Sequence, residues 1–305
     1  MLTLFAVPKQ FQGPMDVIQR NAIRSWTLLR PRPEIILFGD EEGTAEAAKE
    51  FGVGHVAKIE RNEYGTPLVN DLFESAQRLA RHEVLCYVNA DIILMSDFTE
   101  AVRRVVDWVR RFLIIGQRWD TEIKEPLDFS ADWESNLRSL AIGQGKLHSP
   151  TGIDFFVFSR GIWNEIPPLA LGRTTWDNWL IYRARSGRIP VIDATEVVTA
   201  VHQDHDYRHV PSNAGDAWKG PEAKRNWELA GGVGHVFNSQ DATHVLTHRG
   251  IRRALDRAHI VRLIKTTPQL YSPLNPLFMI VRAFVLIPAL AKAAFWKITT
   301  TGRKQ

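Results

Sequence analysis

The stretch Val84-Leu85-Cys86-Tyr87-Val88-Asn89-Ala90-Asp91 decides the fold, because five apolar residues run without interruption toward a carboxylate. Buried parallel strands show such continuous apolar runs, whereas half-exposed strands alternate. Ligands of open α/β sheets bind just beyond the carboxyl ends of the strands, so Asp91 is expected at a binding edge. A carboxylate there can hold a divalent cation against a phosphate, since hard cations prefer oxygen ligands. The alternative is that Asp91 only begins the turn into Ile92.

Strand-like and helical segments alternate on both sides of this stretch. Strands are expected at residues 3–7, 34–38, 55–59, 112–116, 153–158 and 190–192, and helices at residues 16–29, 44–51, 66–81, 97–111 and 175–185. Thr66 and Pro67 suit the N-cap and first turn of the third helix. Residues 119–150 are expected to form a loop. The alternation predicts an α/β, Rossmann-like fold with a central, mostly parallel mixed sheet flanked by helices.

Composition narrows the class of protein. A chain of 305 residues can bury a large core. The single cysteine, Cys86, lies inside the apolar strand, which excludes a disulfide framework and a thiolate metal site and fits a reducing compartment. Residues 1–7 lack the basic and apolar regions of a signal peptide and are better explained as the first strand. We therefore expect a cytoplasmic protein.

Three further polar clusters lie at the ends of expected elements: Gly152-Ile153-Asp154, Trp176-Asp177-Asn178-Trp179 and His202-Gln203-Asp204-His205-Asp206-Tyr207. A lone histidine is usually packed or solvated, but imidazole and carboxylate together suit several divalent metals. Asp177 either complements the dipole of its helix or works beside two indoles that stack on a sugar, and both interpretations stay open. Asp154 is a functional residue only if it points into the same cleft.

In this order, the Asn-Ala-Asp ending at Asp91, the aromatic strand Gly152–Phe158, Trp-Asp-Asn-Trp-Leu and His-Gln-Asp-His-Asp-Tyr resemble a glycosyltransferase of the GT-A fold. The chain is most similar to family-2-like enzymes that act on nucleotide-diphosphate sugars, over roughly residues 3–250. One position departs from the family pattern. The usual Asp-x-Asp has Asn89 in its first place, so only Asp91 matches a metal-binding carboxylate.

The resemblance implies a donor site. Val7 and Lys9 would border the nucleobase and ribose, and Asp40 would face the base. Asp91 would bind Mn²⁺ or Mg²⁺ bridging the diphosphate, with His202 completing the metal or phosphate contacts. A departing diphosphate needs its growing charge neutralised, which a metal ion and cationic side chains supply.

The resemblance also assigns residues around the transferred sugar. Asn89 would contact the sugar or ribose, and Asp177 matches the carboxylate that serves as general base in inverting members. Such a base accepts the proton of the acceptor hydroxyl during attack. Asp154, Trp176 and Trp179 are expected to contact the acceptor.

The predicted function is transfer of a sugar from a nucleotide-diphosphate donor to a hydroxyl of a glycan or lipid-linked acceptor. Lys9 and Arg173 are either phosphate partners or plain surface cations. A sugar-1-phosphate nucleotidyltransferase would have a related sheet, but it needs a glycine-rich basic loop after the first strand, and residues 7–11 offer none.

Two more functions are compatible with these residues. One is that of a metal hydrolase centred on His202, His205 and Asp206, and the second is that of a non-catalytic relative that binds sugar or membrane. No nucleic-acid partner is expected.

The last part of the chain, residues 251–305, is expected to be a helical basic tail behind a transferase domain of residues 1–250. No acidic residue follows Asp256, so residues 257–305 carry +8 in a chain of net charge +4, which leaves −4 for residues 1–256. Helices are expected at 251–265 and 275–298, the second about 34 Å long. Its three cations share one face, as in an interfacial helix. The tail either binds an anionic membrane surface through residues 257–305, on the inner face of the membrane, or packs on the domain or a dimer partner.

Overall fold

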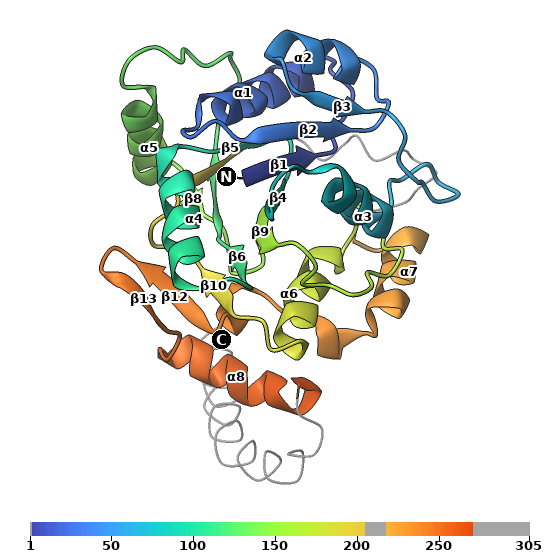
Figure 1. Cartoon of the computed structure of the whole chain (residues 1–305), viewed down its shortest axis with the longest axis vertical. Helices are drawn as coiled ribbons and strands as arrows, with labels where there is room; N and C mark the ends of the chain where they lie inside the picture. The colour runs from blue at the N-terminus through green and yellow to red at the C-terminus, as the bar shows by residue number, and fades with distance from the viewer. Residues whose placement is uncertain (1, 205–217, 271–305) are drawn as a thin grey trace, which may run out of the picture. The chain divides into compact units, whose positions relative to one another are not determined.

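The computed structural model describes residues 2–204 and 218–270 (Figure 1). The chain divides into two compact units, Met1–Arg253 and Ala254–Gln305. The first unit contains a nine-stranded sheet in the order β13-β12-β10-β6-β9-β4-β1-β2-β3 and a four-stranded sheet in the order β5-β11-β7-β8. Helices flank the large sheet, so the predicted α/β class is confirmed.

The strands of the large sheet are β1 (Leu2–Ala6), β2 (Glu34–Phe38), β3 (Gly54–Val56), β4 (Val84–Val88), β6 (Leu113–Ile115), β9 (Phe155–Ser159), β10 (Val191–Asp193), β12 (His244–Thr247) and β13 (Gly250–Arg253). The small sheet contains β5 (Ile92–Ile93), β7 (Arg118–Thr121), β8 (Lys146–Leu147) and β11 (Ala200–Gln203). The helices of the first unit are α1 (Pro14–Leu28), α2 (Thr44–Phe51), α3 (Val69–Leu79), α4 (Ser96–Trp108), α5 (Trp133–Gln144), α6 (Trp176–Ser186) and α7 (Pro221–Ala230). The second unit contains α8 (Arg257–Leu270).

The large sheet is parallel except at β9 and β13. Strand β9 runs antiparallel between β4 and β6, and β13 runs antiparallel along β12. Val88, the last residue of β4, lies opposite Phe155, the first residue of β9. The residues that follow β4 therefore meet those that precede β9, and the Asn89 N–H donates to the Asp154 carbonyl at 2.9 Å. This pairing builds the edge of the sheet for which the sequence predicts function.

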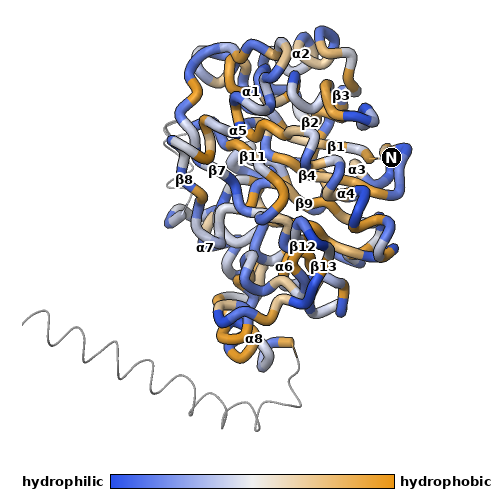
Figure 2. The backbone as a smooth tube through the Cα atoms, turned by 90° about the vertical axis from the view of Figure 1, so that its left-hand side faces the viewer, coloured by the Kyte–Doolittle hydropathy of each residue, from blue (hydrophilic) through white to orange (hydrophobic). Residues whose placement is uncertain are grey.

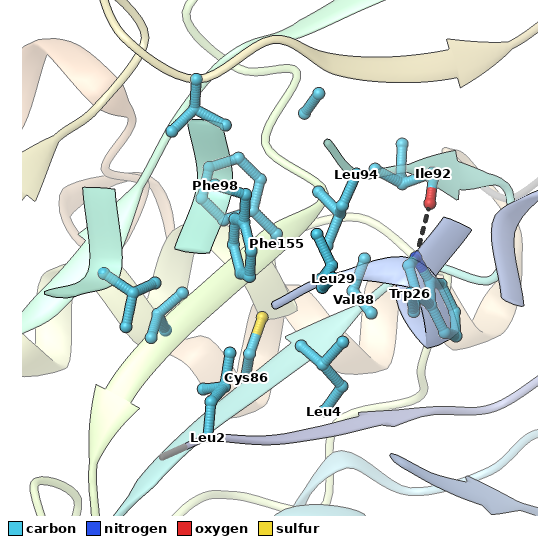
Figure 3. Close-up of a cluster of buried hydrophobic side chains, with 14 of the residues drawn as sticks. Leu2, Leu4, Trp26, Leu29, Cys86, Val88, Ile92, Leu94, Phe98 and Phe155 are labelled. Atoms are coloured by element: carbon cyan, nitrogen blue, oxygen red, sulfur yellow. Dashed lines mark hydrogen bonds between the residues drawn. The ribbon is translucent and has the colours of Figure 1, made fainter. Parts of the chain in front are cut away.

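The two faces of the large sheet carry different cores. Aliphatic side chains from α1, α2 and α4 pack on one face, where the indole N–H of Trp26 donates to the Ile92 carbonyl at 2.9 Å (Figure 3). Aromatic rings fill the opposite face, with Phe73 of α3 stacked on Tyr87 and Phe158. Burial of each large apolar side chain contributes about 1.5–3 kcal/mol. The sheet is therefore fixed from both sides.

The prediction of a loop over residues 119–150 is wrong, since β7, α5 and β8 lie there. Helix α5 buries only Leu137 and Ala141, so its apolar periodicity is weak. The third helix begins at Val69 rather than near Thr66. Residues before it form an antiparallel bridge between Arg61 and Pro67, which competes with the expected cap.

The helix predicted over residues 251–265 begins later. Residues 250–253 instead pair with β12 as an edge strand, and α8 begins at Arg257 and continues through Pro268. The second tail helix, predicted at 275–298, lies outside the described residues. Within the described residues, no helix combines the length and apolarity needed to cross a membrane.

Candidate active site

Polar residues from four strand ends meet at one edge of the first unit. Asp91 follows β4 and precedes β5, whose Ile92 pairs with His202 of β11. Strand β11 also pairs with β7, with His202 opposite Asp120. The small sheet thus brings His202 between Asp91 and Asp120, three residues that are far apart in sequence.

Three carboxylates surround the imidazole of His202, whose side chain is only 4% exposed. Its Nε2 lies 3.7 Å from Asp91 Oδ2, and its Nδ1 lies 3.4 Å from both Asp120 Oδ1 and Asp204 Oδ1. A potential metal ligand atom of each of three residues, Asp120, His202 and Asp204, lies within 4.8 Å of the other two. Imidazole nitrogen and carboxylate oxygens are suitable ligands for Mn²⁺ and related divalent ions, so this carboxylate–imidazole cluster fits such a metal.

Asp120 is held from two sides. Arg118 Nε donates to its Oδ1 at 2.8 Å, and His148 Nδ1 lies 2.6 Å from its Oδ2. Burial alone raises the pKa of Asp120, but the contact with His148 and the charge of Arg118 outweigh it and bring that pKa below its ordinary value. The ionised form of Asp120 is therefore favoured over that of a free carboxyl group.

A hydrogen-bonded chain leads from this cluster into the sheet. Arg118 Nη1 donates to Asp154 Oδ2 at 2.8 Å, and Asn89 Nδ2 donates to Asp154 Oδ1 at 2.5 Å. The Tyr87 hydroxyl in turn donates to Asn89 Oδ1 at 2.7 Å. Both ends of the Asn89 amide are thus engaged, and Asp154 points into the same site, as its predicted role requires.

Asp177 lies in the first turn of α6. Burial raises the pKa of Asp177 to about 7, with a further rise from the charge of Asp154 and an opposing effect of backbone N–H groups. Burial also raises the pKa of the Tyr87 hydroxyl, and the charges of Asp91, Asp154 and Asp177 raise it further. The charges of Asp91, Asp154 and Asp177 therefore all act on the Tyr87 hydroxyl. Thr175, just before α6, adopts φ 77°, a strained conformation of the kind that clusters at functional sites.

The two indoles beside Asp177 belong to the core. Trp176 is 5% exposed and packs on Tyr87 with ring centroids 5.2 Å apart, and Trp179 is also buried. Their contact with an acceptor stays a prediction, and burial of both rings gives it no support.

The predicted donor residues lie around the first two strands. Val7 is half-buried after β1, and Lys9 has an exposed side chain while its backbone N–H and C=O pair with the buried Gln19 amide. Asp40 follows β2, is 71% exposed and pairs with Arg61 Nη2 at 2.8 Å. The exposed parts of these side chains are accessible to a nucleotide.

Arg173 has a structural partner. Its Nε donates to Glu222 Oε2 at 2.7 Å in a nearly buried pair, and its Nη2 reaches Thr66 Oγ1 at 3.2 Å. Although burial favours the neutral acid, hydrogen bonds from Asn62, Thr66 and Arg173 lower the pKa of Glu222. Arg173 as a phosphate partner stays a prediction.

Sequence reasoning missed Arg118 and Asp120 and left Asp204 unassigned. The signal was the alternation Arg118-Trp119-Asp120-Thr121, which is typical of a strand with one polar face. It lies in a segment whose polar composition favours a loop.

The chain has the GT-A glycosyltransferase fold, as comparison with solved structures shows. GalNAc-T7, solved with UDP, GalNAc and Mn²⁺, is 15% identical, with a TM-score of 0.50 over 76% of this chain and 48% of that chain. S. aureus TarS 1–349 with UDP-GlcNAc is 11% identical, with a TM-score of 0.46 over 72% and 64%. The mannosyltransferase PcManGT of Pyrobaculum calidifontis, with GDP-Man and Mn²⁺, is 16% identical, with a TM-score of 0.43 over 68% and 57%.

The aligned part of the chain spans 60–64% of the length of the TarS 1–349 structures it matches. No protein-family model matches the sequence, and no curated protein is similar to it.

Proposed function

We propose that this protein is a metal-assisted glycosyltransferase that moves a sugar from a nucleotide-diphosphate donor to an acceptor hydroxyl. One observation carries the proposal. Asp177, whose pKa burial raises to about 7, follows Trp176, and the Trp176 ring packs on Tyr87 at 5.2 Å. Tyr87 in turn begins the hydrogen-bonded chain that leads through Asn89, Asp154 and Arg118 to Asp120 of the carboxylate–imidazole cluster. General acid–base groups work best when their pKa is close to the working pH.

Each part of the site supports one requirement of the reaction. Asp177 accepts the proton of the attacking hydroxyl, because its pKa makes it basic enough at neutral pH and still largely ionised above it. Asp120, Asp204 and His202 on the Nδ1 side of the imidazole, or Asp91 and His202 on its Nε2 side, would hold Mn²⁺ or Mg²⁺, which when bound neutralises charge on the diphosphate leaving group.

Donor contacts are proposed for the residues beyond β1, β2 and β4. Val7, Lys9 and Asp40 border the nucleoside, while Asn89 faces the sugar or ribose. Arg173 contributes positive charge near the phosphates, shared with Glu222. GalNAc-T7, which has the same fold, was solved with UDP and Mn²⁺, and this makes a UDP-sugar with Mn²⁺ the first donor to test.

The acceptor is proposed to be a glycan or a lipid-linked glycan. Asp154 would orient the acceptor, and the hydrogen bonds that its carboxylate accepts from Asn89 and Arg118 support this role by fixing its position. Trp176 and Trp179 would support the acceptor site from the core.

The test is a thermal-shift panel of nucleotide-sugars with Mn²⁺, with Mg²⁺ and with chelator. We expect stabilisation by one nucleoside class, larger with metal than with chelator. Stabilisation by no nucleotide under any metal condition would overturn the function. Asp91→Ala with full metal-dependent binding would overturn the metal assignment alone.

We also propose that residues 1–250 form the transferase domain and that residues 251–305 form a tail that attaches it to the inner face of an anionic membrane. The excess of +8 after Asp256 supports this. The full chain is expected to pellet with anionic vesicles, and a chain truncated after Lys265 less so. Equal pelleting of both chains would refute the role of the tail.

A further inference from the structure

A second polar surface lies at the β13 edge of the large sheet, around the hairpin β12–β13. Here the end of α4 contacts the hairpin β12–β13. Arg104 Nη2 donates to the Thr247 carbonyl at 2.6 Å, and the rings of Trp108 and His244 lie 4.8 Å apart. Figure 1 shows α4 beside β6 and the hairpin. We call the exposed side chains of this region the arginine face: Trp108, Arg110, Arg111, Arg249, Arg252 and Arg253.

The charge of the arginine face is not neutralised. Within the described residues, none of its five guanidinium groups pairs with a carboxylate, whereas the nearby Arg103 bridges Glu100 and Asp107. Residues 244–253 contain no acidic residue at all, and much of the tube near β13 is coloured hydrophilic in Figure 2. Burial lowers the pKa of His244, and the charges of Arg253 and Arg185 lower it further. Five cations without an acidic partner thus gather on a unit, residues 1–253, whose own net charge is −3.

Trp108 gives this surface an apolar anchor. Its side chain is 46% exposed although it is among the largest apolar groups of the unit. Indole rings prefer the level of lipid headgroups, where the ring is half-buried and the N–H stays wet. An exposed tryptophan among such arginines is the combination that an anionic membrane surface attracts.

We propose that the arginine face binds the anionic headgroups of a lipid bilayer. The basic tail supports this choice of partner, because the chain leaves the first unit at Arg253, within the face itself, and continues with eight cations and no acid after Asp256. The face and the tail adjoin in the chain, so one anionic surface can attract both. The folded unit supplies a fixed orientation, which a tail alone cannot.

The experiment uses the full chain and sedimentation with vesicles of phosphatidylcholine, with and without phosphatidylglycerol. The test variant replaces Arg249, Arg252 and Arg253 with Gln. Its matched control replaces the exposed Lys49, Lys58 and Lys224 with Gln, which removes the same charge elsewhere on the unit. We expect the test variant to bind anionic vesicles about 100-fold more weakly than the wild type, since each cation near the surface contributes about 1 kcal/mol. The control is expected to bind like the wild type.

Three outcomes would overturn the proposal. The first is equal partitioning of the test variant and the control, and the second is equal binding of the wild type to neutral and anionic vesicles. The third is that the test variant loses binding to duplex DNA while its binding to vesicles stays intact. Unchanged thermal unfolding of the test variant shows that it is folded. Nucleotide-sugar stabilisation of the same proteins is measured in parallel. It separates failure of the arginine face from failure of the proposed glycosyl transfer.

Discussion

Asp177→Asn is the sharpest test of the candidate site, because it removes one proton acceptor and leaves the shape of the side chain. Asp177 has a pKa of about 7, so about a tenth of the enzyme would carry the ionised base at pH 6 and about nine tenths at pH 8. We expect kcat/KM of the wild type to rise about tenfold between these pH values. The variant should lose about 10²–10⁴-fold in transfer, with no such pH dependence.

The raised pKa of Asp177 lowers the stability of the folded chain as pH rises, although it increases activity over the same range. The pKa of Asp177 is higher in the folded chain than its ordinary 3.8, so the folded state disfavours ionisation, and its stability falls as pH rises from about 4 to about 7. The shift of about three units corresponds to at most about 4 kcal/mol, and partial solvent contact reduces this to about 2 kcal/mol. Because Asn carries no charge, the variant should be more stable than the wild type above pH 7 by about that amount. Below pH 4 the difference should vanish.

Transfer is measured as release of nucleoside diphosphate from the donor that the panel identifies, and stability by urea unfolding at pH 4, 6 and 8. Asp107→Asn, on the exposed end of α4, is the matched control and should change neither quantity. Donor binding by the Asp177 variant should stay within a few-fold of the wild type. Retained transfer, or a variant less stable than the wild type at pH 8, would refute the role of Asp177 as base.

Three further predictions concern the surrounding structure. Asp204→Asn should weaken Mn²⁺ binding at least about tenfold, measured by a titration that follows the electron paramagnetic resonance signal of free Mn²⁺. Unchanged affinity would place the ion on the Asp91 side of the imidazole. Asn89→Asp should cost about 1–3 kcal/mol in urea unfolding at pH 7, because it sets a second carboxylate against Asp154, and equal stability would contradict the hydrogen bond between them. Trp26→Phe should cost about 1–3 kcal/mol by the same measurement, since it leaves the buried Ile92 carbonyl without its donor, and a neutral change would count against this bond.

The sequence predicts seven of the nine strands of the large sheet, because these strands are short apolar runs, but it misses β12 and β13 and assigns residues 251–253 to a helix. The stretch 84–88 is β4, and apart from β5 the alternation of strands and helices follows the expected order up to residue 116. The small sheet escapes prediction. Its strands are two to four residues long and polar on one face, and they exist only because β11 pairs with both β5 and β7. Such pairing joins residues about 80 to 110 positions apart, beyond the reach of local periodicity.

The candidate site divides in the same way. The sequence predicts Asp91 and His202 as partners, and the structure brings them to 3.7 Å. Asp120 could not be inferred, because its place beside His202 depends on the register of β7 against β11. Trp176 and Trp179 are easily found in the sequence, but the sequence does not decide their role. An aromatic residue at a helix start is equally compatible with sugar stacking and with core packing, and only the tertiary fold decides that both indoles are buried.

Asn89, which stands where the usual motif has its first carboxylate, fits the hydrogen bonds of this site. Its amide must accept from Tyr87 and donate to Asp154 at once, which a carboxylate cannot do. A second acid there would add negative charge to a phenol whose pKa three carboxylates already raise. Asp120 adds a carboxylate from another strand on the Nδ1 side of His202, and contacts with Arg118 and His148 favour its ionised form. The charge available to a divalent cation is therefore retained although the local motif has lost one acid, because the small sheet delivers a carboxylate that the linear pattern does not contain.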